Sequence, residues 1–186
     1  MSHLFRILLT LFILLLTAFV LMGVFAPKNY QVQRTKTIHA SPNVVWAQLV
    51  NFKNWKNWSV WNEKDKNMQT TYSGKDGDIG AMMNWTGNDS VGTGSLTLKS
   101  ISLNKEMTYE FAMKKPVALN ALGTINLKNA TDTSVEVTWI DYADLPFKLR
   151  PFMHFMNMES MLGADFERNL SKLDQVSKEI QTKLKN

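Results

Sequence analysis

Hydrophobic positions divide the chain into three parts with different periodicity. Residues 4–26 form a nearly continuous apolar run in which Arg6 is the only charged residue. Beyond this run, short stretches of alternating apolar and polar residues continue to about residue 142 and predict β-strands. The last part, from about Phe152 to Leu184, has apolar residues at helical spacing and predicts one long amphipathic helix.

The first part predicts a membrane anchor over residues 4–26. As a helix, the uncharged residues from Ile7 to Ala26 span roughly 30 Å, which matches the hydrocarbon core of a bilayer. The alternative is a cleaved signal peptide, but its apolar core usually has about 7–15 residues, and Pro27 suits cleavage after Ala26 poorly. Basic residues on the two sides give no clear bias. We expect a single-pass protein of a bacterial inner membrane, with the following domain facing the periplasm.

The middle part predicts an antiparallel sheet of about seven strands. A first strand over residues 30–40 is followed by a helix, with Ser41 as N-cap and Pro42 at its first position. Further strand-like runs are separated by short turns rich in Gly, Asn and Asp, and neighbours joined in this way pair antiparallel. These runs are residues 68–73, 79–85, 91–103, 106–113, 117–129 and 133–142.

Together the sheet and the final helix predict an α+β domain over residues 31–184. The helix has an apolar stripe that must be buried on the sheet, its only large partner. The stripe consists of Leu162, Phe166, Leu170, Leu173, Ile180 and Leu184. A strongly curved sheet cannot close completely around a long helix, so we expect a cavity that binds apolar molecules.

Composition excludes several classes of function. The 186-residue chain is 45% hydrophobic, enough for one well-packed domain with an appendage. It has no cysteine, which excludes disulfides, thiol catalysis and thiolate metal sites. The formal net charge of +5 is compatible with a nearby anionic membrane surface, but it is small for a nucleic-acid-binding protein.

Tryptophans are concentrated in one short segment. Trp55, Trp58 and Trp61 are spaced by three, and Trp46 stands upstream. Interleaved lysines formally fit a stacking platform for nucleic acid, but the other basic residues are dispersed among acids, so we expect no nucleic-acid partner. Tryptophans also favour the membrane interface. We expect them to border the mouth of the cavity, with their N–H groups bound to polar partners.

Five stretches carry a resemblance to a known superfamily. They are "IHASPNVVWAQLVNFKNWKNWSVW", "YSGKDGDIGAMMNW", "VGTGSLTLKSI", "SVEVTWIDYADLP" and "MLGADFERNLSKLDQVSKE". Over about residues 31–180 the chain resembles the SRPBCC superfamily of START-like and polyketide cyclase/dehydrase-like domains. One departure is Val60, where many relatives have proline.

This resemblance implies a helix-grip fold of the START/Bet v1 type, a curved antiparallel sheet around a long C-terminal helix with a pocket for a hydrophobic ligand. It does not imply one activity, because the superfamily includes lipid carriers, hormone receptors, aromatic cyclases and oxygenase domains.

Three functions remain open at this point. We expect a membrane-anchored domain that binds a small hydrophobic or lipid-like ligand in its cavity. A cyclase/dehydrase-like enzyme acting on a hydrophobic substrate in the same cavity is the alternative, and an interaction module with a solid core is the third. The residues expected to contact the ligand are Trp58, Trp61, Trp85, Tyr109, Phe111, Trp139, Phe155, Met158 and Leu162.

Two residues are weak candidates for catalysis. Asp141 shares its alternation with Val137 and Trp139, so its carboxyl group is expected to point inward, where it could hold a polar head or transfer a proton. His154 would need a partner to act as a base. The structural alternatives are a solvated strand-end Asp and an exposed His. No metal-ligand spacing or phosphate-binding glycine loop occurs, so we expect neither metal nor cofactor.

Overall fold

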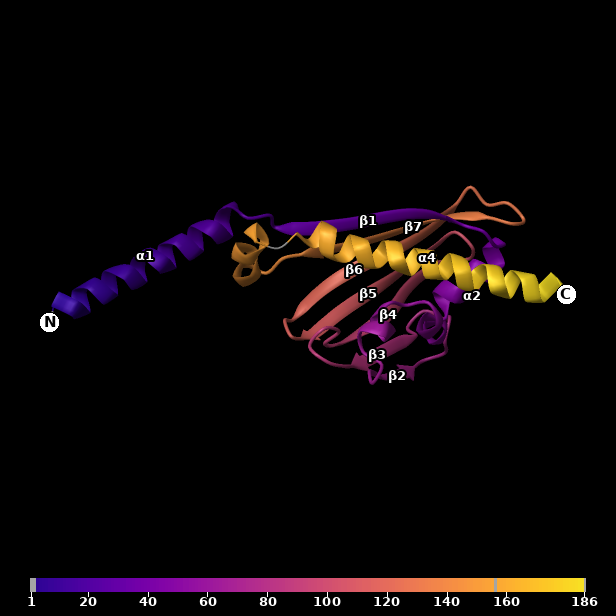
Figure 1. Ribbon diagram of the computed structural model, residues 1–186, viewed down its shortest axis with the longest axis horizontal. Helices are drawn as coiled ribbons and strands as arrows, with labels where there is room; N and C mark the ends of the chain where they lie inside the picture. Colours follow the sequence, from indigo (N-terminus) through magenta and orange to yellow (C-terminus); the bar gives the residue numbers. More distant parts are fainter. Residues whose placement is uncertain (1–2, 156, 186) are drawn as a thin grey trace.

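The computed structural model describes residues 3–155 and 157–185 (Figure 1). An apolar helix, α1 (His3–Phe25), extends away from an α+β domain. In this domain the long helix α4 (Met158–Lys185) lies across a seven-stranded sheet. The free end of α1 and the C-terminal end of α4 lie at opposite ends of the long axis.

All strand pairs in the sheet are antiparallel, in the order β1-β7-β6-β5-β4-β3-β2. The first strand of the chain pairs with the last, and every other neighbour is consecutive in sequence. The strands are β1 (Asn29–Ile38), β2 (Gln69–Ser73), β3 (Met82–Thr86), β4 (Thr93–Ser102), β5 (Glu106–Lys115), β6 (Leu119–Lys128) and β7 (Val135–Asp144). The predicted antiparallel sheet of seven strands is therefore confirmed.

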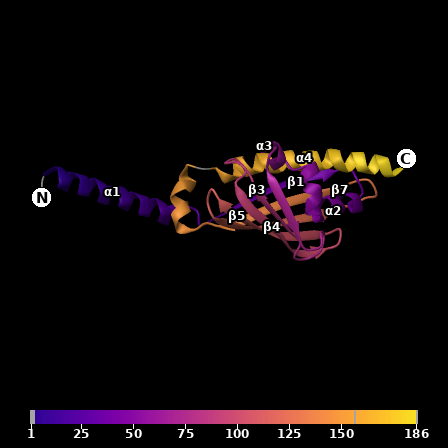
Figure 2. The same cartoon turned by 90° about the horizontal axis from the view of Figure 1, so that it is seen from below.

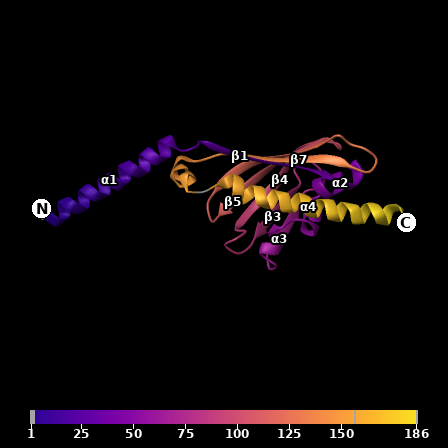
Figure 3. The same cartoon turned by 45° about the horizontal axis from the view of Figure 1, so that its top comes forward.

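Three short helices connect β1 to β2: α2 (Pro42–Val50), η1 (Phe52–Asn57) and α3 (Trp61–Lys64). As predicted, α2 begins after Ser41 with Pro42 at its start, although the Ser41 side chain makes no capping bond. Instead, the Ser41 N–H donates to Gln181 Oε1 of α4 at 3.0 Å. Figure 3 shows α2 beside the C-terminal half of α4, at the end of the domain that lies away from α1.

The buried face of α4 closes the core. Its buried residues include Gly163, Phe166, Leu170 and Leu173, spaced by three and four as one helical face requires. A Cβ atom on Gly163 would lie 2.0 Å from Nη2 of Arg34, so the guanidinium of Arg34 on β1 lies directly against α4 at this glycine. Figure 2 shows the strands curving along one side of α4.

The final helix begins later than its sequence pattern predicts. Residues Phe147–His154 form a separate 3-10 helix, η2, which contains Pro151. The side chain of Asn157 accepts a hydrogen bond from the N–H of Ser160 at 3.0 Å, and this N-terminal cap starts α4 at Met158. At the other end, Leu184 is 70% exposed, because the last turn of α4 runs past the apolar surface. Met156 lies outside the described residues.

Helix α1 has 23 residues and is long and apolar enough to cross a membrane. Its last turns contact the domain through η2. The rings of Phe19 and Phe152 meet edge to face at 6.2 Å, and Gly23 packs against Phe147. The Nε2 atom of His154 lies 3.0 Å from the carbonyl oxygen of Met22. The domain therefore has one end, with η2, that lies next to α1.

Candidate functional site

A cavity of about 680 Å³ lies between the inner face of the sheet and the N-terminal half of α4. Its volume is within the range of roughly 300–1,000 Å³ that is typical of small-molecule sites. Most of its wall is aromatic, aliphatic or methionine side chains, among them Met83, Trp85, Leu96, Phe111, Met113 and Leu162. The interior at this end is hollow, which removes the basis for a solid-core interaction module.

The cavity reaches the end of the domain that lies next to α1. Its wall includes Val91 before β4, Pro116 and Val117 between β5 and β6, and Phe152 of η2. Strand register places the end of β5 beside the start of β4, and the end of β7 beside the start of β1, at this same end. Around it, Val117, Phe152 and Met161 are at least 43% exposed. Apolar side chains therefore border the cavity on the side of α1.

A row of residues across the sheet places a carboxyl group in the cavity wall. Tyr109 of β5 pairs with Gly123 of β6, which pairs with Asp141 of β7. A Cβ atom on Gly123 would lie 1.9 Å from Cζ of Tyr109, so the tyrosine ring occupies the space above this glycine. The Tyr109 hydroxyl thereby reaches across β6 and donates a hydrogen bond to Asp141 Oδ1 at 2.7 Å.

Trp139 completes this arrangement. Its Nε1–H donates to the Tyr109 hydroxyl at 2.7 Å and lies 3.3 Å from Asp141 Oδ1. Burial raises the pKa of Asp141 to about 6, against the opposing effect of the two donors. Burial and the nearby Asp141 charge raise the pKa of Tyr30 to about 12 and that of Tyr109 well above its usual value. Both tyrosines are therefore neutral donors at neutral pH, facing a carboxyl group that titrates near it.

The inner end of the cavity is an aromatic wall. Trp139 stacks on Phe166 of α4 with ring centroids 4.6 Å apart, and Trp55 and Trp58 pack edge to face against Trp139. Trp55 Nε1–H donates to the carbonyl of Leu49 at 2.8 Å, which satisfies the buried indole. Trp55 and Trp139 therefore form the interior wall of the cavity, and Trp58 packs in the core behind them. Neither Trp55 nor Trp58 borders the mouth.

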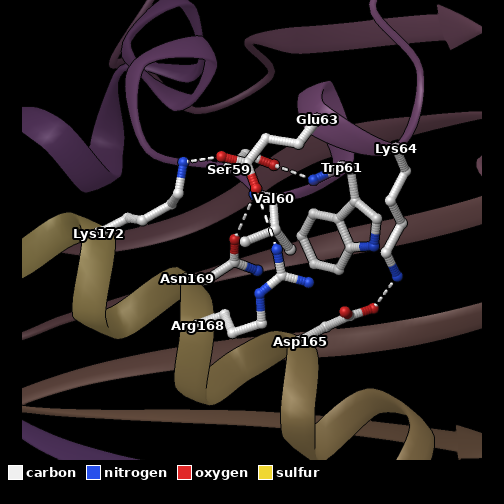
Figure 4. Close-up of polar contacts among 9 residues, drawn as sticks. All are labelled: Ser59, Val60, Trp61, Glu63, Lys64, Asp165, Arg168, Asn169 and Lys172. Carbon is white, nitrogen blue, oxygen red and sulfur yellow. Dashed lines mark hydrogen bonds and ion pairs between the residues drawn. The ribbon is translucent and has the colours of Figure 1, made fainter.

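Polar contacts fix the segment 59–64 onto α4 (Figure 4). The N–H of Val60 donates to Asn169 Oδ1 at 2.7 Å, and Lys64 pairs with Asp165. Glu63 pairs with Arg168 at 3.0 Å and also with Lys172. These contacts come from both sides of Trp61 and position its indole in the wall of the cavity.

Most residues predicted to contact a ligand lie together in this wall, and their role in binding stays a prediction. Those lining the cavity are Trp61, Trp85, Tyr109, Phe111, Trp139, Met158 and Leu162. Trp58 does not line it, because its side chain is 0% exposed and packs in the core, with Nε1 3.3 Å from the carbonyl of Gln48. Phe155 does not line it either, because it lies beyond η2 and is 79% exposed.

The structure separates the two candidates for catalysis. Asp141 lines the cavity, as its alternation predicted. His154 lies instead in a shallower depression that Phe155 and Pro27 also line, and its ring contacts α1. The sequence pattern placed His154 in the last helix, which in the structure begins only at Met158. His154 belongs instead to η2, which turns toward α1. A shared role in proton transfer within the cavity is therefore not supported for His154.

Several residues of the cavity wall were not among the predicted ligand contacts, including Tyr30, Leu145, Phe152 and Phe166. Tyr30 could have been found, since it alternates in phase with the buried Val32 on β1. Leu145 and Phe152 could not, because their positions depend on how η2 folds back. Within residues 3–155 and 157–185, no cluster of three or more His, Asp or Glu residues could hold a metal ion.

The curved sheet around α4, with a cavity between them, defines a helix-grip domain of the Bet v1/START-like class. A family model described as polyketide cyclase/dehydrase and lipid transport matches residues 30–178, so the chain belongs to that family. A comparison with curated proteins finds no match.

Solved structures share the fold at low sequence identity. Ginseng major latex-like protein 151 from Panax ginseng is 10% identical with a TM-score of 0.58, covering 81% of this chain and 99% of that one. Protein MLL2253 from Mesorhizobium loti is 16% identical with a TM-score of 0.55, covering 78% and 95%. Protein XoxI from Bacillus cereus is 16% identical with a TM-score of 0.55, covering 81% and 96%.

Proposed function

We propose that the chain is a membrane-anchored protein that binds a small hydrophobic or lipid-like ligand in the cavity between α4 and the sheet. The observation that supports this most directly is the cavity of about 680 Å³ with its largely apolar wall. Burying apolar ligand surface there gains roughly 25 cal/mol per Å², the main driving force for such binding. The lipid-transport description of the family agrees with this class of ligand.

The cavity and the anchor lie at the same end of the domain. With α1 in the bilayer, η2 and the apolar border of the cavity lie close to the membrane surface. The charged residues of this end are Lys28, Lys114, Lys115, Lys148 and Arg150, together with Asp89, Asp144 and Glu159. This excess of positive charge favours an anionic headgroup layer. The ligand would then exchange between the bilayer and the cavity without crossing bulk water.

A matched pair of substitutions on α4 tests binding. Leu162→Trp adds an indole inside the cavity, whereas Leu184→Trp adds the same group on the exposed last turn. The full chain in lipid nanodiscs is incubated with an environment-sensitive apolar dye, and bound lipids are extracted for mass spectrometry. We expect Leu162→Trp to lower dye uptake at least about fivefold, a loss of roughly 1 kcal/mol of binding free energy, and Leu184→Trp to match the wild type. Equal uptake by both variants would contradict the proposal.

The orientation of the membrane helix is the second part of the proposal: α1 spans a bacterial inner membrane and the domain faces the periplasm. An apolar helix that precedes a large folded domain can act as a signal anchor, which exports the domain that follows it. C-terminal fusions to alkaline phosphatase, which is active only outside the cytoplasm, test this against fusions to a fluorescent protein that folds in the cytoplasm. An inactive phosphatase fusion beside a fluorescent one would reverse the assignment.

A second candidate function is catalysis of the cyclase/dehydrase type, with Asp141 as the acid or base. The raised pKa of this cavity carboxyl group, about 6, is the observation that favours it, because a proton-transfer group works best near the operating pH. Proton abstraction from a bound ligand in D2O would add deuterium to it. Deuterium uptake by the wild type that is lost in Asp141→Asn would support catalysis, and no uptake in either would remove it.

A further inference from the structure

The polar groups in the cavity are unequally matched in charge. Lys64 and Asp165 both line it, and they form an ion pair with each other. Lys56 also lines it, but this residue is exposed, so water solvates its charge. Asp141 also lines it, but within residues 3–155 and 157–185 no Lys, Arg or His forms an ion pair with this carboxylate. Its nearest titratable neighbours are two neutral phenols, Tyr109 of β5 and Tyr30 of β1.

The two oxygens of Asp141 also differ. Oδ1 accepts the hydrogen bond from Tyr109 and the weaker contact from Trp139. No donor of the described residues reaches Oδ2, which remains open to a group in the cavity. Asp141 is half-buried because its side chain faces the cavity. The arrangement orients one oxygen and leaves the other for a group inside the cavity.

The orientation is built into the sheet. Tyr109 reaches Asp141 only because Gly123 between them has no side chain. Trp139, on the same strand as Asp141, is held in turn by its stack on Phe166. Residues of three strands and of α4 thus fix the position of the Asp141 carboxyl group. A solvated Asp at the end of a strand would need none of these contacts.

We propose that Asp141 binds the polar end of the ligand, and that this end is a hydrogen-bond donor, a protonated amine or a hydroxyl group, on a mostly apolar body. This inference rests on the proposed function of the cavity as a ligand site. A donor head satisfies Oδ2, and a cationic one also neutralises the unpaired charge. Carboxylate and phosphate heads are disfavoured, because a second negative charge next to Asp141 is repelled strongly where water is scarce.

Three probes with the same chain test the assignment: dodecylamine, dodecanol and dodecanoate. The full chain in nanodiscs of zwitterionic lipid is incubated with equal amounts of the three, and protein-bound molecules are counted by native mass spectrometry. The variant is Asp141→Asn. The control is Glu110→Gln, the same change on the outer face of β5, where Glu110 pairs with Lys99. For one probe, partition into the lipid is the same for all protein samples and cancels between variants. Between probes, retention is corrected for the partition of each probe into nanodiscs without protein.

We expect the wild type and Glu110→Gln to retain dodecylamine and dodecanol at least about tenfold over dodecanoate, equivalent to 1.4 kcal/mol. Asp141→Asn should lower dodecylamine retention about tenfold and change dodecanol retention less than about threefold, because its amide still pairs with a hydroxyl. If the wild type retains dodecanoate as well as it retains dodecylamine and dodecanol, the assignment is overturned. This outcome does not depend on any variant. An unchanged preference in Asp141→Asn would also overturn the assignment.

Both of those outcomes leave binding in the cavity intact and reject only the role of Asp141. Failure of the wild type and Glu110→Gln to retain any of the three probes would instead reject the proposed function, and this inference with it. The two failures are therefore distinguishable in one experiment.

Discussion

The two halves of the domain use the same sheet and the same helix in different ways. In the half next to α2, side chains such as Trp58, Phe52 and Leu173 are 0% exposed and fill the space between α4 and the strands. In the half next to α1, the wall made by Trp139 and Phe166 ends the packed core, and the space beyond it is hollow. Stability therefore depends mainly on one half, and the other half holds the space that we propose for a ligand.

The largest expected effect on the free energy of unfolding comes from replacing tryptophans, and it should differ between a tryptophan of the packed half and one of the hollow half. Trp58→Ala removes a side chain from the packed half and should lower the free energy of unfolding by about 3–5 kcal/mol. Trp61→Ala removes the same side chain from the cavity wall, where empty space already exists, and should cost about 1–2 kcal/mol. Chemical denaturation of the full chain in nanodiscs measures both. Equal losses would mean that the two halves are packed alike.

The next effect concerns the boundary between the halves. Gly123→Ala places a Cβ atom where the Tyr109 ring lies, and should lower the free energy of unfolding by about 1–3 kcal/mol through overpacking. Combining it with Tyr109→Ala should cost less than the sum of the two single changes, since the clash is then relieved. Additive losses, measured by the same denaturation, would contradict the close contact between these residues.

Asp141→Asn is expected to raise the free energy of unfolding at neutral pH, and by less than the substitutions above lower it. Its pKa of about 6 lies above the ordinary 3.8, so the folded protein binds this proton more tightly than the unfolded chain. The contribution of Asp141 to stability is therefore complete below the unfolded pKa of 3.8 and is lost as the pH rises from there through about 6. At pH 7.5 we expect the variant to be more stable than the wild type by about 1–2 kcal/mol, with no difference near pH 4. A constant difference across this range would show that Asp141 does not titrate in this way.

The smallest effect is expected on the exposed contacts of segment 59–64. Glu63→Gln breaks the ion pairs with Arg168 and Lys172, both on the solvent side of α4. Exposed ion pairs contribute little to stability and are screened by salt. Denaturation at physiological ionic strength should show no measurable change, with a small loss emerging only at low salt. A large loss of unfolding free energy at high salt would mean that these ion pairs stabilise the packed core and are not merely exposed contacts.

The strands and their pairing could be predicted because alternation is a local signal. Val137, Trp139 and Asp141 occupy alternate positions of one strand, so their side chains must share a face, and the two apolar ones mark that face as the inner one. The same signal identified Tyr109 and Phe111 as inward, and both line the cavity.

The boundary between core and cavity could not be predicted in this way. Trp58 and Trp61 have the same residue type and neighbouring positions, yet one is fully buried and the other lines the cavity. The difference arises from the turn between η1 and α3 and from contacts with α4 more than 100 residues away, such as Val60 with Asn169. His154 and Phe155 were misplaced for a related reason: the cap at Asn157, rather than the apolar pattern, sets the start of α4.

Only residues 26–28 separate the end of α1 from the start of β1. Fully extended, three residues reach roughly 10 Å, which is less than the diameter of the domain itself. With α1 in a bilayer and a ligand in the cavity, as proposed above, a domain tethered so closely could not carry that ligand to another membrane. Any recipient would have to come to it, by diffusion along the same bilayer or by docking from the aqueous side.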